Sequence, residues 1–250
     1  MNLTQFIERH PHRFAAILEA SVVIAYLAAG TAAHLLGLPN LALYGLANLG
    51  LTLIAALLLT RLKWWKRAGF RPLHSVRDLL YFLVALIPVG LNAIPGVQVG
   101  SIAQISSVLA ITAMVAFAEE ALFRGLMLQA IQPRGHWRAV LLSAALFGLT
   151  HAMNALTGKS APEIAMQIGY AVAVGFAYAA LALKKEVLWP LVLTHFLTDL
   201  VYFIQKPGFV LPPFWQTFSV LSLTILFSVY GVLVMRQKPR QQQETPSPTQ

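Results

Sequence analysis

Three short groups of ionisable residues interrupt long apolar stretches of this 250-residue chain. One group comprises Glu119, Glu120 and Arg124, and the other two contain His151 and His195. Charged side chains are costly at the depth of a bilayer, and there they mark functional sites by default. Carboxylates and imidazoles are the side chains that most often transfer protons in catalysis. The predicted chemistry is therefore proton transfer, either in hydrolysis or along an ion pathway.

The spacing in the first group gives its two carboxylates different surroundings. Glu120 and Arg124 are four residues apart, so on a helix they share a face and can form an ion pair. Glu119 points about 100° away around the helix. Two carboxylates with one guanidinium leave an excess negative charge, which favours Glu119 as a general base. An ion pair that only fixes helix packing would not need the second glutamate.

The histidine groups repeat this helical spacing. His151 follows Phe147 by four residues, and His195 precedes Asp199 by four, so each pair shares a helix face. His195 and Asp199 are therefore able to bond to each other. A lone histidine in a span is more often a hydrogen-bonded packing residue, so a common location of the three groups is needed to favour catalysis.

The elements that must position these residues are membrane helices. The chain is 58% apolar and 11% charged, whereas soluble domains are about 25% charged. This composition excludes an ordinary soluble enzyme and a disordered chain. Because a spanning helix needs about 20 mostly apolar residues, we expect an all-α polytopic membrane protein with eight transmembrane helices. The predicted spans are Phe14–Leu36, Leu41–Thr60, Leu79–Ile94, Ile102–Ile131, Ala139–Leu156, Ile164–Leu183, Val187–Ile204 and Phe214–Met235.

The basic residues predict the orientation of these spans. Of the 18 Lys and Arg residues, 15 precede the first span, follow the last or occupy alternate loops. Positive charge collects in cytoplasmic loops, so both termini are expected in the cytoplasm. The net charge of +9 then reflects topology and anionic lipid rather than nucleic acid. The segment Arg61–Arg77, with Trp64 and Trp65, is predicted to anchor the chain at the interface.

The three groups are predicted to lie at one depth. At about 1.5 Å per residue, Glu119, His151, His195 and Asp199 lie about 14–20 Å from the cytoplasmic ends of their spans. A hydrocarbon core is about 30 Å thick, so all four fall near the midplane and predict a shared polar cavity. Glu19 is near an end of the first span, and we expect it to reach towards the headgroups without a catalytic role.

Three kinds of chemistry fit this set of residues. In hydrolysis, Glu119 takes a proton from water held by His151, while His195 with Asp199 stabilises the oxyanion. A zinc hydrolase would use Glu and His ligands, although the sequence lacks HExxH. A proton or ion pathway is the third, although no repeat typical of transporters is evident. The chain contains no cysteine, which excludes disulfides, thiolate metal sites and a Cys nucleophile.

The three groups resemble the motifs of the CPBP family of intramembrane glutamic endopeptidases, which includes the CAAX prenyl-protein endopeptidase and Abi-type bacterial proteins. The resemblance extends from the fourth predicted span to the seventh, and it implies an eight-helix fold with a cavity open to the cytosol. It also implies peptide-bond hydrolysis without a covalent intermediate. The motif EExxxR appears as Glu119-Glu120…Arg124, FxxxH as Phe147…His151 and HxxxN/D as His195…Asp199.

The resemblance also implies a role for each site residue. Glu119 and His151 would activate the water, and His195 with residue 199 would support the oxyanion. Glu120 and Arg124 would shape and neutralise the site. The prenyl-processing branch has Asn where this chain has Asp199, and an ionised Asp only accepts hydrogen bonds. Asp199 is therefore expected to orient His195 or to keep it charged.

The sequence thus predicts one transmembrane domain over residues 1–240, with a motif-bearing core at 102–204 and a disordered cytoplasmic tail at 241–250. The predicted function is an intramembrane endopeptidase that acts on a membrane-associated peptide or protein. We expect no metal ligand and no cofactor, although a zinc-dependent peptidase stays an alternative. A non-catalytic membrane scaffold or immunity protein is the other alternative. The sequence determines neither the substrate nor the oligomeric state.

Overall fold

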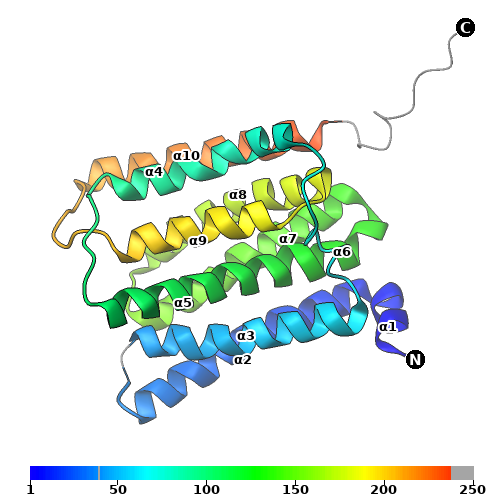
Figure 1. Ribbon diagram of the computed structural model, residues 1–250, viewed down its shortest axis with the longest axis horizontal. Helices are drawn as coiled ribbons and strands as arrows, with labels where there is room; N and C mark the ends of the chain where they lie inside the picture. The colour runs from blue at the N-terminus through cyan, green and yellow to red at the C-terminus, as the bar shows by residue number, and fades with distance from the viewer. Residues whose placement is uncertain (39, 238–250) are drawn as a thin grey trace, which may run out of the picture.

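The computed structural model describes residues 1–38 and 40–237, and these residues form a bundle of helices (Figure 1). Within these ranges the only strand-like pairing is an isolated antiparallel bridge between Val97 and Gln205. The all-α class is therefore as predicted. The α-helices are α1 (Leu3–Arg9), α2 (Pro11–Leu35), α3 (Asn40–Leu62), α4 (Ile87–Ala93), α5 (Ile102–Glu120), α6 (Leu128–Ile131), α7 (His136–Thr150), α8 (Ala161–Lys185), α9 (Trp189–Phe203) and α10 (Pro213–Met235). Between them are the 3₁₀-helices η1 (Val76–Leu86), η3 (Gln132–Arg134) and η4 (His151–Thr157), and the π-helix η2 (Ala121–Met127).

Six helical stretches are long and apolar enough to cross a membrane, which supports an integral multi-pass protein. Helices lie at all eight predicted places, but α7 and α9 have only 15 residues each. At about 1.5 Å per residue, each is about 22 Å long, short of the roughly 30 Å hydrocarbon core. The count of eight spans therefore stays a prediction. The six stretches are Pro11–Leu35, Leu43–Leu62, Val76–Ala93, Ile102–Arg134, Ala161–Lys185 and Pro213–Met235.

The motif-bearing helices occupy the middle of the bundle. Figure 1 shows α2 and α3 along one side and α4 and α10 along the opposite side, with α5, α7, α8 and α9 between them. Helix α5 packs against α3 and α9, and α8 packs against α7 and α10. The contact of α7 with α8 is close, because a Cβ atom on Gly148 would lie 2.2 Å from Val172 Cγ2. Helices α5 and α8 therefore each lie between two neighbouring helices.

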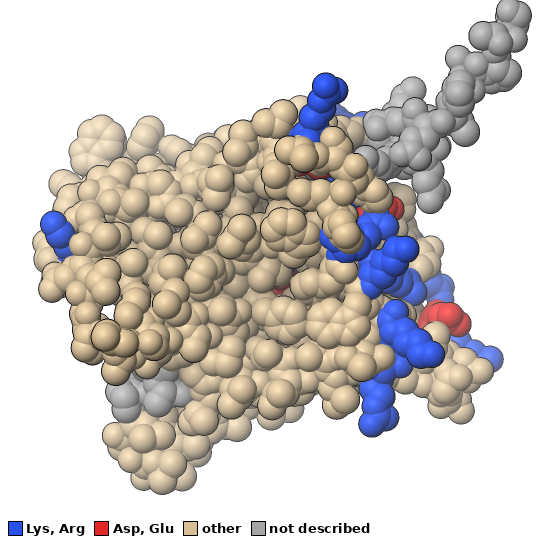
Figure 2. Space-filling model, viewed as in Figure 1, with Lys and Arg blue, Asp and Glu red and all other residues tan. Residues whose placement is uncertain are grey.

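Lys and Arg side chains gather at one end of the bundle, the end at which the N-terminus lies (Figures 1 and 2). This distribution matches the charge pattern of the loops, while the placement of that end in the cytoplasm stays a prediction. Whether the segment Arg61–Arg77 anchors the chain at the interface stays a prediction, but its two tryptophans pack on the protein. Trp64 is buried and lies under the Arg67 guanidinium, and Trp65 stacks on Phe117 of α5.

The extents of the predicted domain and tail remain predictions. The helical bundle fits a single domain over residues 1–240, but its end and the core limits 102–204 are not separately tested. The predicted disordered tail, residues 241–250, lies outside the described residues.

Candidate active site

A change of helix type follows the first motif directly. Helix α5 ends at Glu120, and the π-helix η2 then runs from Ala121 to Met127. π-Turns are rare and occur frequently at functional sites, because the wider turn redirects the side chains around it. Here every residue of η2 is buried, and Arg124 lies within it. The motif therefore occupies an irregular, enclosed part of the long helix.

Glu120 and Arg124 form the predicted ion pair. Arg124 Nη1 lies 3.2 Å from Glu120 Oε1, and both side chains are fully buried. The Arg124 guanidinium also lies 4.0 Å from the centre of the Phe147 ring, a cation–π contact. Arg124 Nε and Nη2 have no hydrogen-bond partner among the described residues. Glu120 and the rings of Phe147, Tyr178 and Phe123 therefore stabilise this buried cation.

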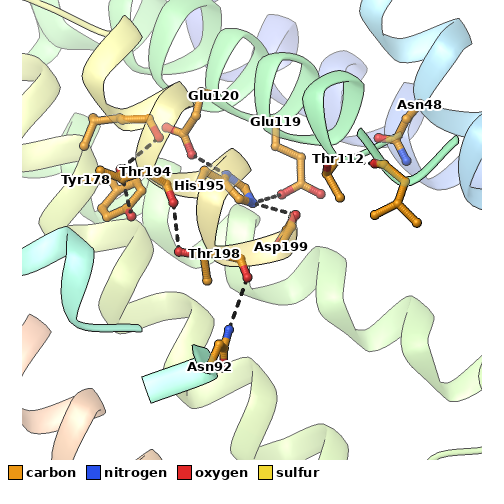
Figure 3. Close-up of polar contacts among 12 residues, drawn as sticks. Asn48, Asn92, Thr112, Glu119, Glu120, Tyr178, Thr194, His195, Thr198 and Asp199 are labelled. Atoms are coloured by element: carbon orange, nitrogen blue, oxygen red, sulfur yellow. Dashed lines mark hydrogen bonds and ion pairs between the residues drawn. The ribbon is translucent and has the colours of Figure 1, made fainter. Parts of the chain in front are cut away.

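His195 is the point at which the carboxylates meet (Figure 3). Its Nδ1 atom lies 3.0 Å from Glu120 Oε1, and its Nε2 atom lies 3.7 Å from Glu119 Oε2 and 3.5 Å from Asp199 Oδ2. Helices α5 and α9 are therefore neighbours, with residues 75 positions apart in hydrogen-bond contact. The sequence predicted the contact of His195 with Asp199, but not its contacts with the glutamates.

His151 reaches this cluster through an aromatic ring. Its Nδ1 atom lies 3.0 Å from the Phe147 carbonyl oxygen of the same helix turn. The Phe147 ring lies 5.1 Å from the His151 ring and 6.5 Å from the His195 ring, between centroids. Within the described residues, no hydrogen bond joins His151 to Glu119. His151 lies where α7 ends and η4 begins, so this residue also marks a change of helix type.

Exposure separates the motif side chains into two kinds. Glu120 is fully buried, whereas 13% of the Glu119 side chain, 15% of that of His195 and 27% of that of Asp199 is accessible. The Glu119 and Asp199 carboxylates are therefore partly accessible, whereas the Glu120–Arg124 pair is enclosed by protein. The shared polar cavity predicted from the sequence stays a prediction, although the polar cluster itself is present.

Several polar side chains from other helices hold the motif helix α9 in place, and sequence reasoning missed them. Thr194 is within hydrogen-bond distance, 3.3 Å, of the Tyr178 hydroxyl in α8. Asn92 of α4 donates to the Thr198 carbonyl oxygen at 3.2 Å (Figure 3). Gln205 donates to the Asn92 carbonyl oxygen at 2.9 Å. The only available signal in the sequence was that these residues are polar and lie within apolar spans. A single polar residue does not indicate which other helix holds its hydrogen-bond partner.

Glu19 does not reach towards the headgroups as expected. One of its carboxylate oxygens accepts a hydrogen bond from Thr150 Oγ1 at 3.1 Å, and the other is buried without a hydrogen-bond partner in the described part of the chain. The Glu19 carboxylate of α2 thus lies against α7, where it contacts the residue that precedes His151. The side chain turns inward because Thr150 offers a donor there.

Among the described residues, no group of three or more His, Asp and Glu side chains has a geometry able to hold a metal ion. His195 with its carboxylates is therefore an ion-pair and hydrogen-bond cluster as it stands.

Comparison with known proteins gives a match for part of the chain. Residues 101–201 match the family model described as type II CAAX prenyl endopeptidase Rce1-like. This match confirms the resemblance seen in the three motifs, all of which lie inside it, and the family implies a membrane protease. The comparisons with curated proteins and with solved structures gave no match.

Proposed function

Because residues 101–201 match a family of CAAX endopeptidases, we propose that this protein is an intramembrane glutamic endopeptidase. It hydrolyses a peptide bond of a membrane-bound peptide, using a water molecule activated by Glu119 and His151. The observation that carries the proposal is the meeting of all three motifs around His195, with Glu119 and Asp199 partly accessible. A packing device would not need accessible carboxylates at the centre of apolar helices.

Glu119 is the carboxylate best placed to accept a proton from water. The cation of its own motif, Arg124, is paired with Glu120 instead. The closest charged contact of Glu119 is His195 Nε2 at 3.7 Å, which is longer than a hydrogen bond. This leaves the Glu119 oxygens able to accept hydrogen bonds from a water molecule, as a general base must.

The hydrogen bond of His151 determines which of its nitrogens faces the reaction. A carbonyl oxygen only accepts hydrogen bonds, so Nδ1, which lies 3.0 Å from the Phe147 oxygen, carries the hydrogen. In the neutral ring this leaves Nε2 as an acceptor that can hold the same water as Glu119. Phe147 thus orients His151 through its backbone and separates it from His195 through its ring.

His195 is arranged to support the oxyanion that forms when water attacks the peptide carbonyl. Its Nδ1 side is fixed at 3.0 Å by Glu120, which Arg124 fixes in turn. Its Nε2 atom is 3.5 Å and 3.7 Å from two carboxylates, so neither forms a short hydrogen bond with it. An N–H at Nε2 can then donate to the negative oxygen of the tetrahedral intermediate, the arrangement of an oxyanion hole.

The proposal is tested with purified protein in lipid nanodiscs and CAAX-type peptides, with and without a prenyl group. Mass spectrometry should detect a shortened peptide with the wild type and none with His151→Ala, whose imidazole no longer holds the water. Preference for the prenylated peptide would define the substrate class. Cleavage that His151→Ala leaves unchanged would contradict the mechanism. Loss of cleavage after chelation, with recovery on adding zinc, would replace it with the metal-dependent alternative.

The rate of cleavage by Asp199→Asn should stay within about tenfold of the wild-type rate. A tenfold change in rate corresponds to about 1.4 kcal/mol in the activation free energy. Asparagine retains an oxygen that accepts hydrogen bonds and has nearly the same shape, while it removes one of the three negative charges around His195. Asp199→Leu, which removes the acceptor as well, should lose considerably more. The cleavage rates of both variants are measured on the same peptide. Equal losses of rate would show that the charge of Asp199, rather than its hydrogen bonding, is required.

A further inference from the structure

A cavity of about 380 Å³ lies at the basic end of the bundle, away from the candidate active site. Its volume is within the range of small-molecule sites, about 300–1,000 Å³. The lining comes from three parts of the chain that are distant in sequence. These are the loop between α3 and η1 (Lys66, Arg67, Arg71), the segment from α6 through η3 to the start of α7 (Gln129, Gln132, Pro133, His136), and the end of α8 (Ala182, Leu183, Glu186).

The walls of this cavity, here called the basic pocket, are tied together by hydrogen bonds. Arg67 Nη2 donates to the Gln129 carbonyl oxygen at 2.9 Å, and Arg71 Nε donates to the Glu186 carbonyl oxygen at 2.8 Å. The backbone N–H of Leu188 donates to the Gly69 carbonyl oxygen at 2.8 Å. Gly69 has a φ of +92°, and a Cβ atom there would lie 2.8 Å from Leu188 N, so only glycine allows this approach. The pocket is therefore preformed.

The charges of the basic pocket are not balanced within it. Its one carboxylate, Glu186, forms an ion pair with Arg71. Lys66 and Arg67 form no ion pair with a carboxylate in the part of the chain that the structure describes, which leaves two positive charges facing the cavity. Partial burial lowers the pKa of Arg67, and the negative charge of Glu8 opposes this shift. A guanidinium in that setting gains from an anion beside it.

The position of the basic pocket indicates what anion it meets. The lining residues lie at the ends of the long helix 102–134 and of α8, where a bilayer presents its headgroups. Positive charge in a loop is enough to set the orientation of a membrane protein. That role does not require a concave site with fixed walls. Basic pockets between helices at this level are suited to phosphate-bearing headgroups. The side-chain amides of Gln129 and Gln132 add further possible donors.

We propose that the basic pocket is a binding site for the phosphate group of an anionic phospholipid, separate from the candidate active site. Lys66 and Arg67 contact the phosphate, while Arg71 is held by Glu186 and shapes the wall. The site links the protein to the composition of one leaflet, and it does not depend on the proposed peptidase activity.

The test measures binding of phosphatidylglycerol, with phosphatidylcholine as the neutral comparison, by native mass spectrometry of the full chain released from detergent. The wild type should retain phosphatidylglycerol in preference to phosphatidylcholine. Lys66→Gln and Arg67→Gln should each weaken its binding about fivefold, which corresponds to roughly 1 kcal/mol per charge. Lys63→Gln and Arg77→Gln are the matched controls, because these exposed residues belong to the same basic stretch but do not line the pocket. Both should bind like the wild type.

A second arm of the experiment adds inorganic phosphate, which distinguishes recognition of the phosphate group alone from recognition of the whole lipid. Competition by inorganic phosphate would show that the phosphate alone is recognised, and its failure to compete would show that the intact lipid is the ligand; either supports the site. Equal losses in the control variants, or equal binding of the two lipids, would overturn the proposal. Lys66 is exposed, so Lys66→Gln is expected to fold normally even if Arg67→Gln does not. Because the measurement is of binding, it stands even if the protein cleaves no peptide.

Discussion

Replacement of Glu119 by glutamine is expected to lower the rate of peptide cleavage by about 10²- to 10⁴-fold, the usual contribution of a general base. Glutamine keeps the size of the side chain and one acceptor oxygen, but it cannot take a proton from water. Because Glu119 forms no short ion pair, the substitution breaks no strong contact in the bundle. The loss should therefore appear in kcat, with the unfolding transition close to that of the wild type.

The measurement compares initial rates in nanodiscs at equal amounts of folded protein. Glu8→Gln is the matched control, because it makes the same chemical change at an exposed position at the end of α1, far along the chain from the motifs. It should cleave at the wild-type rate. A Glu119→Gln variant that retains its full rate would remove Glu119 from the mechanism, while a large loss of stability in that variant would assign it a structural role.

The contacts that the sequence predicted are those within a single helix. The pairs Glu120–Arg124 and His195–Asp199 are four residues apart, and helix geometry brings such side chains together whatever the rest of the fold. The composition and the lengths of the apolar stretches likewise indicated an all-helical membrane protein, because the bilayer allows few other structures.

The contacts between helices were not predictable in the same way. His195 lies against Glu119 and Glu120 because α5 and α9 are neighbours, and hydropathy does not say which helices pack together. The depth of the motif residues showed only that they were able to meet. Glu19 illustrates the same limit, since its hydrogen bond with Thr150 depends on the packing of α2 against α7.

Local irregularities of the helices were also missed. Residues 121–127 form a π-helix and residues 151–157 a 3₁₀-helix, and no pattern in these sequences predicted either one. In the third predicted span, Pro88 lies in the first turn of α4, where proline is tolerated because the N–H that it lacks would have no partner within the helix. There η1 ends at Leu86 and α4 begins at Ile87. Hydropathy detects apolar stretches but not the hydrogen-bond pattern within them.

The buried pair Glu120–Arg124 gives the second large expected effect, on stability. Arg124→Met or Glu120→Met alone should lower the free energy of unfolding by about 3–5 kcal/mol, since each leaves a charge buried without its partner. The Arg124 substitution also removes the cation–π contact with Phe147. The double variant should be less destabilised than the sum of the two, by about 0.5–3 kcal/mol, because no unpaired charge of this pair is left.

Unfolding in a membrane mimetic measures all three variants, with Arg138→Met as a control that removes an exposed arginine and should change stability by less than about 0.5 kcal/mol. Additive effects would show that Glu120 and Arg124 do not act as a pair.

A folded double variant would also separate stability from catalysis. His195 would then keep its Nε2 contacts but lose Glu120 from Nδ1, so its ring would no longer be fixed for the oxyanion. Cleavage should fall even where the fold recovers, because Glu120 reaches the reaction only through His195.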